Sequence, residues 1–321
     1  MKIVDFEKKH VESAKLIAAK NYHDEREYVP ILPNIDVLPD LEYFACNGLG
    51  VAAFDDDRLI GFLCCYEPWD NAFDSAAKGT FSPIHAHGAV KENRRLIYQK
   101  MYQVAAEIWV KQNITYHAIG HYAHDTESLN AFFTYGFGLR CIDAIRPMVE
   151  IECQPCDGIY FEELTKSDVI RVREMRQMLS EHMGNSPCFM YSSLEDFKSW
   201  LVRAEKRNSR LFVAKDCEKL IAFVEVKSNG ENFVTEVDNM CNICGAFCLP
   251  AFRGKNINQN LLNFTIQKLK GEGYKLLGVD FESFNPTAYG FWLKYFTAYT
   301  NSVVRRIDEC ALQQFTTFMC P

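Results

Sequence analysis

The sequence repeats itself, and this repeat limits the possible folds more than any other feature of the chain. Residues 55–62 (DDDRLIGF) resemble residues 216–223 (DCEKLIAF), and residues 130–148 resemble residues 289–308. The aligned pairs are Leu59 with Leu220 (220 − 59 = 161), Phe132 with Trp292 (292 − 132 = 160) and Arg146 with Arg306 (306 − 146 = 160). A nearly constant offset predicts a duplicated unit of about 150 residues, an ordinary size for one domain. We therefore expect two domains, residues 1–150 and residues 159–321.

The second half has the residue pattern of an α/β layered domain. Apolar runs between turn residues predict strands, and apolar stripes behind capping residues predict helices. The predicted strands are 158–164, 210–216, 219–228, 241–249, 275–283 and 302–309, and the predicted helices are 165–179 (capped by Thr165 or Ser167), 193–207 (capped by Ser193), 258–271 and 286–296. This order mixes hairpins with strand–helix–strand units, which predicts an α/β architecture.

The segment CLPAFRGKNINQNLLNF, residues 248–264, has features of a cradle for a phosphate group. The first amides of a helix have no intrahelical partner, and together with the helix dipole they favour a pyrophosphate. Arg253 and Lys255 add positive charge at this turn, and Gly254 lies between them. The alternative is an ordinary strand–turn–helix connection.

Two asparagines, Asn256 and Asn258, stand where phosphate cradles usually have glycine. Asparagine tolerates the left-handed backbone better than other side chains do, and it is also a good helix cap. The turn geometry of a cradle is therefore compatible with this sequence, although an asparagine leaves less room for a close phosphate than a glycine does.

Charge and cysteine content limit the function classes and the compartment. The formal net charge is −7 and the pI is about 5.7, which argues against nucleic acid as a partner and suits a cationic substrate such as an amine. The sequence has no apolar run of the ~18 residues that a membrane span needs. Thirteen cysteines without an export signal are typical of reduced thiols, so we expect a cytoplasmic protein.

Groups of histidines and cysteines are alternative candidates for a functional site. Five histidines gather in the first half: His85, His87, His117, His121 and His124. Three roles are open for them, namely metal binding, contact with a substrate, and ordinary packing. Two Cys-x-x-Cys pairs, 153/156 and 241/244, lie 241 − 156 = 85 residues apart, far more than the ~15–20 residues of a zinc ribbon. We therefore predict no metal site.

From residue 159 to residue 308 the order of motifs resembles that of the GNAT superfamily of acyl-CoA-dependent N-acyltransferases. Members have Arg/Gln-x-x-Gly-x-Gly/Ala at the start of a helix, then a strand, then a helix with Asn-x-x-Ala-x-x-x-Tyr. This chain has Arg253-Gly254-Lys255-Asn256-Ile257-Asn258 and then Asn285-Pro-Thr-Ala288-Tyr-Gly-Phe-Trp292. Both motif glycines are replaced, and tryptophan takes the place of the usual tyrosine.

The resemblance implies two GNAT-like domains. Each would have a mixed, mostly antiparallel central sheet, helices on both faces and a splayed pair of parallel strands, here residues 243–249 and 276–281. Gly245 would allow the bulge that opens this pair. The cofactor motif of the first half is degenerate, because residues 87–102 have Arg94 and Arg95 but no glycine after Val90.

The resemblance also implies acetyl-CoA or another acyl-CoA as cofactor. Its pyrophosphate would lie on the cradle, and the backbone of Phe247 and Leu249 would bond its pantetheine arm like an added strand. The implied cofactor-binding residues are Phe247, Cys248, Leu249, Arg253, Gly254, Lys255, Asn256, Ile257, Asn258, Asn285 and Trp292.

Acyl transfer to an amine needs a base for the amine proton and an acid for the leaving thiolate. Glu225 and Glu282 are the candidate bases, and Tyr289 is the candidate acid, because Trp292 has no proton to give a thiolate. We expect an N-acetyltransferase whose acceptor is a primary amine of a small molecule or a peptide, with no nucleic-acid or membrane partner. The alternative is a catalytically silent CoA-binding or protein-interaction module on the same fold.

Overall fold

The computed structural model describes residues 1–190, 198–200, 202 and 209–312. The chain forms two compact units, Met1–Ile142 together with Ala298–Pro321, and Asp143–Thr297. These units differ from the predicted domains, because the C-terminal stretch belongs with the N-terminal half. The reason is strand pairing: the last strand, residues 300–306, pairs with strands of the first unit.

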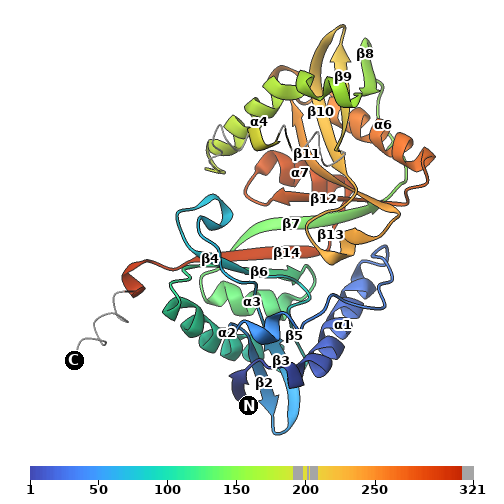
Figure 1. Cartoon of the computed structure of the whole chain (residues 1–321). Helices are drawn as coiled ribbons and strands as arrows, with labels where there is room; N and C mark the ends of the chain where they lie inside the picture. The colour runs from blue at the N-terminus through green and yellow to red at the C-terminus, as the bar shows by residue number, and fades with distance from the viewer. Residues whose placement is uncertain (191–197, 201, 203–208, 313–321) are drawn as a thin grey trace. The chain divides into compact units, whose positions relative to one another are not determined.

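The first unit is a layered α/β structure (Figure 1). Its elements are β1 (Lys2–Asp5), η1 (Lys8–His10), α1 (Val11–Tyr28), η2 (Phe44–Cys46), β2 (Val51–Asp55), β3 (Arg58–Leu63), η3 (Ala72–Asp74), β4 (Gly79–Ser82), β5 (His87–Ala89), α2 (Arg94–Lys111), β6 (Tyr116–Tyr122), α3 (Thr126–Thr134), β7 (Gly138–Pro147) and β14 (Thr300–Arg306). The strands run in the orders β1-β2-β3-β5 and β4-β6-β14-β7. Strand β7 passes into the second unit at Asp143.

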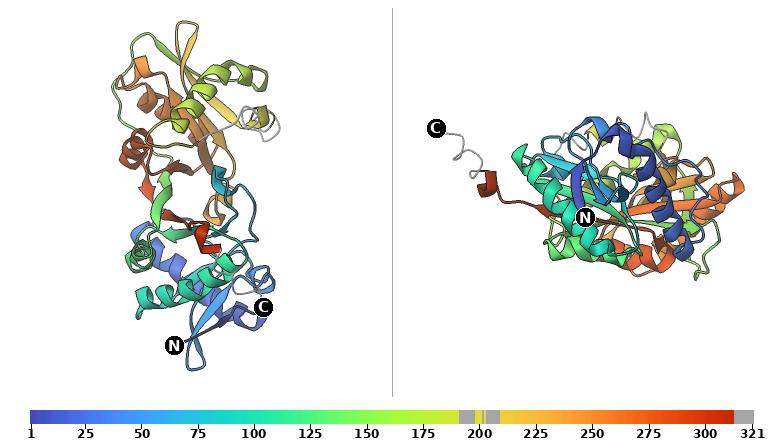
Figure 2. Two further views of the ribbon diagram at one scale, coloured as in Figure 1. Left: turned by 90° about the vertical axis from the view of Figure 1, so that its left-hand side faces the viewer. Right: turned by 90° about the horizontal axis from the view of Figure 1, so that it is seen from below.

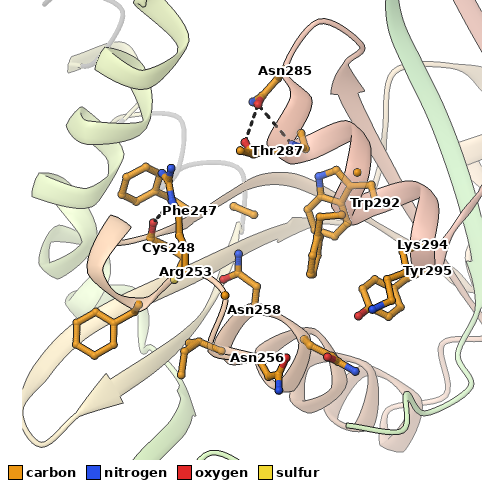
Figure 3. A pocket seen from close by; sticks show the side chains of 18 of the residues that line it. Phe247, Cys248, Arg253, Asn256, Asn258, Asn285, Thr287, Trp292, Lys294 and Tyr295 are labelled. Carbon is orange, nitrogen blue, oxygen red and sulfur yellow. Dashed lines mark hydrogen bonds between the residues drawn. The ribbon is translucent and has the colours of Figure 1, made fainter. Parts of the chain in front are cut away.

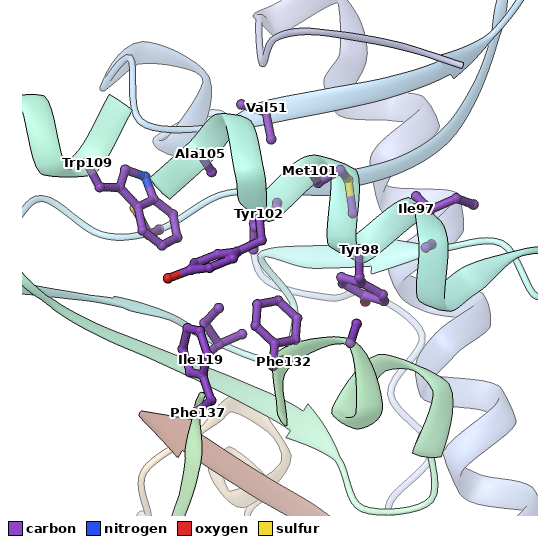
Figure 4. Packing of buried hydrophobic residues seen from close by; sticks show 14 of the residues in the cluster. Val51, Ile97, Tyr98, Met101, Tyr102, Ala105, Trp109, Ile119, Phe132 and Phe137 are labelled. Atoms are coloured by element: carbon purple, nitrogen blue, oxygen red, sulfur yellow. The ribbon is translucent and has the colours of Figure 1, made fainter. Parts of the chain in front are cut away.

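Helices α1 and α2 cover opposite faces of the β1-β2-β3-β5 sheet (Figures 1 and 2). Strand residues alternate between the two faces. Val51 and Ala53 pack in the cluster of α2, whereas Ala52 packs in the cluster of α1. The α2 cluster is rich in aromatic rings, among them the fully buried Tyr102 and Trp109 (Figure 4). Burial of such large rings is a main source of stability for this unit.

The second unit repeats this order of elements. They are β8 (Ile159–Glu163), η4 (Lys166–Val172), α4 (Arg173–Gly184), β9 (Arg210–Asp216), β10 (Lys219–Lys227), η5 (Phe233–Glu236), β11 (Met240–Cys248), η6 (Pro250–Phe252), α6 (Ile257–Gly271), β12 (Leu276–Glu282) and α7 (Pro286–Tyr295), followed by β13 (Thr297–Ala298). The predicted stripe of α6, with Leu261, Leu262, Ile266 and Leu269, is fully buried. The helix predicted from residue 165 begins as a 3-10 helix and continues as α4, and most of the helix predicted at 193–207, with its cap Ser193, lies outside the described residues.

The parallel strands β11 and β12 separate part of the way along. They pair from Met240 with Leu276 to Ile243 with Val279, and β11 then continues to Cys248 along β10 alone. The register between β10 and β11 shifts at Cys244, because Glu225 faces Gly245 while Val226 faces Ile243. This bulge bends β11 away from β12. The predicted fold class, with its splayed parallel pair, is confirmed.

The repeat is visible in the structure. The aligned residues Leu59 and Leu220 lie in β3 and β10, and Phe132 and Trp292 lie in α3 and α7. Arg146 and Arg306 lie in the last strand of each copy, β7 and β14. Over the described residues, no helix combines the length and the hydropathy needed to cross a bilayer.

Candidate functional site

A cavity of about 400 Å³ opens in the second unit beside the separated end of β11 (Figure 3). Its walls come from α4, the last residues of β11, the turn before α6, and α7. The predicted cofactor residues that line it are Phe247, Cys248, Arg253, Gly254, Asn256, Ile257, Asn258, Asn285 and Trp292. The cavity therefore collects both of the motifs that the sequence separates by some thirty residues, the turn at 253–258 and the helix at 286–295.

The turn before α6 has the backbone of a phosphate cradle. Gly254 has φ +76° and Asn256 has φ +60°, so both adopt the left-handed conformation that asparagine and glycine tolerate best. Asn256 precedes the helix, and its carbonyl accepts the first helical bond from the amide of Asn260 at 3.0 Å. The three amides that precede Asn260 in the helix, those of Ile257, Asn258 and Gln259, donate to no backbone carbonyl among the described residues. Such free amides at a helix start favour an anion.

Arg253 and Lys255 differ in their relation to the cavity. Arg253 is anchored, because its Nε donates to the carbonyl of Cys248 at 3.1 Å and its guanidinium lies 5.4 Å from the ring centre of Phe247. Its Nη nitrogens bond no described residue, so they are available to an anion. Lys255 does not line the cavity, and its Nζ lies 5.2 Å from the ring centre of Phe252. Of the two cations of this turn, only Arg253 therefore lies on the cavity wall, where Lys294 of α7 is a further cation.

Leu249 does not offer the backbone groups that the sequence analysis assigned to it. Its amide donates to the carbonyl of Ile221 at 2.9 Å, and its carbonyl accepts from the amide of Phe252 at 2.9 Å. In an antiparallel pair, bonded and non-bonded residues alternate. Since Leu249 is bonded across to β10, the alternation directs Cys248 and Ala246, rather than Phe247 and Leu249, toward the open side of β11. The bulge at Cys244 sets this alternation.

Helix α7 supplies an apolar wall and a cap. Asn285 caps this helix, because its Oδ1 accepts from the hydroxyl of Thr287 at 2.7 Å and from the amide of Ala288 at 3.4 Å (Figure 3). Trp292 is 6% exposed and packs edge-on against Phe291 and Phe296, with ring centres 4.9 Å and 5.5 Å away. Asn285 thus holds the helix in place, and Trp292 closes one side of the cavity.

The candidate acid Tyr289 lies away from the cavity. It is 43% exposed, does not line the cavity, and packs edge-on against Phe281 of β12 at 6.3 Å. Tyr295, one turn after Trp292, lines the cavity instead. Tyr295 is therefore the phenol that α7 presents to a ligand there.

The candidate base Glu225 is a buried and paired carboxylate. It is 4% exposed, and its Oε2 accepts from the indole of Trp200 at 3.1 Å and lies 3.7 Å from the Arg176 guanidinium. A Cβ at Gly245 would come within 2.6 Å of Nη1 of Arg176, so a larger residue there would displace the end of this flexible side chain. Glu225 therefore fixes the bulge region, and neither it nor Glu282 lines the cavity.

Asp280, which like Glu225 and Glu282 does not line the cavity, is a candidate base at the splayed strands that sequence reasoning missed. It is the first residue of β12 beyond the last pair with β11, at Val279. Burial raises the pKa of its carboxyl to about 7, and the nearby carboxylates of Asp143 and Glu231 act in the same direction. A base with a pKa near neutrality is well matched to removing a proton from an amine. The available signal was a lone acid within the apolar run LLGVDF.

His182 is a second residue that the sequence did not single out. It lies on α4 and lines the cavity together with Leu179. Its Nε2 is buried and has no hydrogen-bond partner. Buried polar atoms are normally paired, so this nitrogen is a candidate contact for a ligand.

Two histidines of the first unit, His87 and His117, are satisfied by the core, whereas the buried Nε2 of His121 has no hydrogen-bond partner. His87 bonds the carbonyl of Gly120 at 2.5 Å and the hydroxyl of Tyr98 at 2.9 Å, and His117 bonds the hydroxyl of Tyr102 at 2.9 Å. Burial lowers the pKa of both imidazoles to about 4. Across the described residues, no three His, Cys, Asp or Glu side chains are arranged to hold a metal ion.

Comparisons with known proteins agree with this geometry. Residues 173–296 match the family model of the acetyltransferase (GNAT) family. No curated protein sequence matches the chain. A GCN5-related N-acetyltransferase from Sphaerobacter thermophilus has a similar structure, with a TM-score of 0.56, 12% identity and 95% of each chain covered.

A second similar structure is the GCN5-related glucosamine N-acetyltransferase region of a fungal multi-domain β-N-acetylglucosaminidase. Its TM-score is 0.52 at 13% identity, with 94% of this chain and 38% of that chain covered. At such low identity the two structures show a shared fold. Residues 173–296 thus form an acetyltransferase domain of the GNAT family, within a chain that has the GNAT fold.

Proposed function

We propose that the second unit binds an acyl-CoA, with acetyl-CoA the first choice, and transfers the acyl group to a primary amine of a small molecule or a peptide. The observation that carries the proposal is the cavity of about 400 Å³ that joins a free helix start to the open edge of a splayed strand pair. Diphosphates favour such helix starts, and an extended arm favours an unpaired strand edge.

The residues present fit this cofactor. The amides of Ile257, Asn258 and Gln259 and the guanidinium of Arg253 would hold the diphosphate, and the open edge at Ala246 and Cys248 would bond the arm. Trp292 would pack against its apolar part. Bound acyl-CoA would supply an activated thioester carbonyl.

The chain's own residues would handle the protons. An ammonium group must lose a proton before its nitrogen can attack. Asp280, whose pKa is raised to about 7 by burial, is partly ionised at neutral pH and would accept that proton. Tyr295 would donate a proton to the leaving thiolate, because it is a phenol on the cavity wall. Glu225 would act as a positioning residue through the bulge.

One alternative is a silent CoA-binding or protein-interaction module. The observation that favours it is the replacement of the usual tyrosine by Trp292, which is 6% exposed and packed between two rings. The two proposals share the cofactor site and differ in turnover.

Calorimetry with acetyl-CoA, followed by thioester-consumption assays against a panel of amines, separates these proposals. Binding with turnover on at least one amine supports the transferase. Binding with no turnover on any amine supports the silent module. Absence of binding by acetyl-CoA and by longer acyl-CoA compounds contradicts both.

A further inference from the structure

The first unit has its own cavity, of about 260 Å³, at the corresponding place in the fold. Its walls come from α1, the turn before α2, the end of β6 and the start of α3. In the second unit the corresponding elements are α4, the turn before α6, and α7. The two copies of the fold therefore each hold a cavity at the start of a corresponding helix, α2 in the first unit and α6 in the second.

In the first unit, side chains of the protein itself occupy the start of helix α2. Arg94, the first residue of α2, is 8% exposed and donates to the carbonyls of Ala89 at 2.9 Å and Val90 at 3.2 Å. It also pairs with the carboxylate of Asp125 at 2.9 Å. Asp125 thus already pairs with the cation at this helix start, and its charge would repel an added anion.

The remaining wall of this cavity is acidic. It holds four carboxyl groups and two cations, and with His124 neutral the net charge stays negative even though burial raises the pKa of one carboxyl, Glu25, to about 7. The carboxylates are Asp24, Glu25, Asp125 and Glu127, and the cations are Lys91 and Arg94. A cavity with this charge favours a cationic ligand.

Two buried acceptor atoms on this wall have no hydrogen-bond partner. One is the hydroxyl of Tyr122, a residue that is 5% exposed, and the other is Oδ2 of Asp24. The Nζ of Lys91 lies 3.0 Å from the other oxygen of Asp24, and Arg94 comes no closer than 3.9 Å to Oδ2. Buried polar groups are normally paired, so these atoms indicate a ligand that brings hydrogen-bond donors.

An aromatic pair forms another part of the wall. The rings of Tyr28 and His124 are stacked, with centres 4.8 Å apart and an interplanar angle of 1°. Glu25, which is 2% exposed, fixes His124 by accepting from its amide at 3.2 Å and by bonding its Nδ1 at 2.8 Å. Such a pair suits the alkyl stem of an organic cation and can attract the cation itself.

We propose that the cavity of the first unit binds a small primary amine in its ammonium form, which donates to Asp24 and Tyr122 and lays its alkyl stem along Tyr28. An ammonium group has three donors and no acceptor, which matches the two unpaired acceptors. The volume is below the range of about 300–1,000 Å³ for drug-sized ligands, so the compound is small. The site is independent of acyl-CoA binding in the second unit.

The test is calorimetry on the full chain at low ionic strength, without acyl-CoA, using 1,4-diaminobutane as the probe. Tetramethylammonium, which has the charge without donors, and butyrate, which has the opposite charge, are the comparison compounds. We expect diaminobutane to bind and the other two compounds not to bind. Asp24→Asn should weaken binding at least about tenfold, and Tyr122→Phe about threefold, because each removes one acceptor.

Two control variants make the test specific. Glu107→Gln removes an exposed carboxylate of α2 far along the helix from the cavity, and Arg253→Ala alters the cavity of the second unit. Both should leave diaminobutane binding unchanged, and a change in the Arg253→Ala variant would assign the heat to the second unit. If thermal melting shows that Asp24→Asn does not fold, the nearly isosteric Tyr122→Phe decides.

The proposal is overturned if diaminobutane gives no binding up to about 10 mM. It is also overturned if folded Asp24→Asn and Tyr122→Phe bind like the wild type, or if tetramethylammonium binds equally well. Since the assay contains no acyl-CoA and measures no turnover, its failure leaves the proposed transferase untouched.

Discussion

The cavities of the two units are made from corresponding elements but have opposite chemistry. In the second unit, the start of α6 is open, with free amides and the guanidinium of Arg253 on the wall. In the first unit, Arg94 and Asp125 close the start of α2, and carboxylates line what remains. The comparison shows that a duplicated fold can keep the position of a cavity while the charge of its wall changes, because a few side chains at one helix start decide the local charge.

The largest expected effect is on turnover and concerns the base of the second unit. Asp280→Asn should lower kcat about 10²–10⁴-fold, since a positioned general base contributes about that much, while acyl-CoA affinity should change little. The wild-type rate should rise with pH through about 7, the pKa of Asp280, because the ionised carboxylate is the active form. Steady-state kinetics over pH 5.5–9 for both proteins measure this. A mutant that keeps the wild-type pH profile would exclude Asp280 as the base.

The second-largest expected effect is on stability, and it tests whether the pair of Arg94 and Asp125 holds the turn before α2. Arg94→Ala leaves the 12%-exposed carboxylate of Asp125 without its partner, and loss of one member of a buried pair costs about 3–5 kcal/mol. Urea denaturation should show this loss in the free energy of unfolding. The Arg94→Ala, Asp125→Ala double variant should recover part of it, since no lone charge remains. A single variant as stable as the wild type would mean that the pair does not hold the turn.

The first two predictions depend on features that the sequence shows to different degrees. Strands, helices and the buried stripe of α6 follow from local apolar periodicity, and the left-handed Asn256 follows from the properties of asparagine. The proposed role of Asp280 does not, because its pKa is raised first by burial and then by Asp143 and Glu231, and local sequence shows neither the burial nor these neighbours. The strand at residues 300–306 was predicted as part of the second domain but pairs with strands of the first unit, since a strand pattern does not say which strands it will pair with.

The error at Leu249 has an equally specific cause. The period of a strand is two residues, so one inserted residue reverses which side each backbone group faces. The bulge at Cys244 is such an insertion, and it exchanges the positions of Leu249 and Cys248 at the open edge. Sequence alone predicted a bulge near Gly245 but gave no count of the residues on each side of it.

A smaller effect distinguishes two adjacent cations at the open cradle. Arg253→Ala should weaken CoA binding about tenfold, because a charge-assisted contact to phosphate is lost. Lys255→Ala should change the affinity less than about twofold, because Lys255 does not line the cavity. Calorimetry with CoA measures both variants against the same wild type. Equal losses of CoA affinity in the two variants would show that the combined positive charge of the turn, rather than the position of Arg253, binds the anion.

The smallest expected effect is a difference in acid sensitivity between the units. Burial lowers the pKa of His85, His87 and His117 to about 4, so unfolding takes up protons below the ordinary value of 6.5. Their contribution to stability is complete above pH 6.5 and is lost as the pH falls toward 4. Glu25 acts in the opposite sense, because its pKa is raised to about 7 and its contribution falls as the pH rises from 4.5 to 7.

The three buried histidines together have a larger effect on the pH dependence of stability than Glu25 alone. In the second unit, residues 143–297 contain one histidine, His182. Acid should therefore loosen the first unit before the second. Hydrogen exchange of peptides from each unit, corrected for the intrinsic rate at each pH, measures this between pH 7 and pH 4.5. Protection lost equally in both units would mean that carboxylates common to the two copies, and not the buried histidines, govern the acid response. Protection lost first in the first unit would show that its core carries a pH dependence that the other copy lacks.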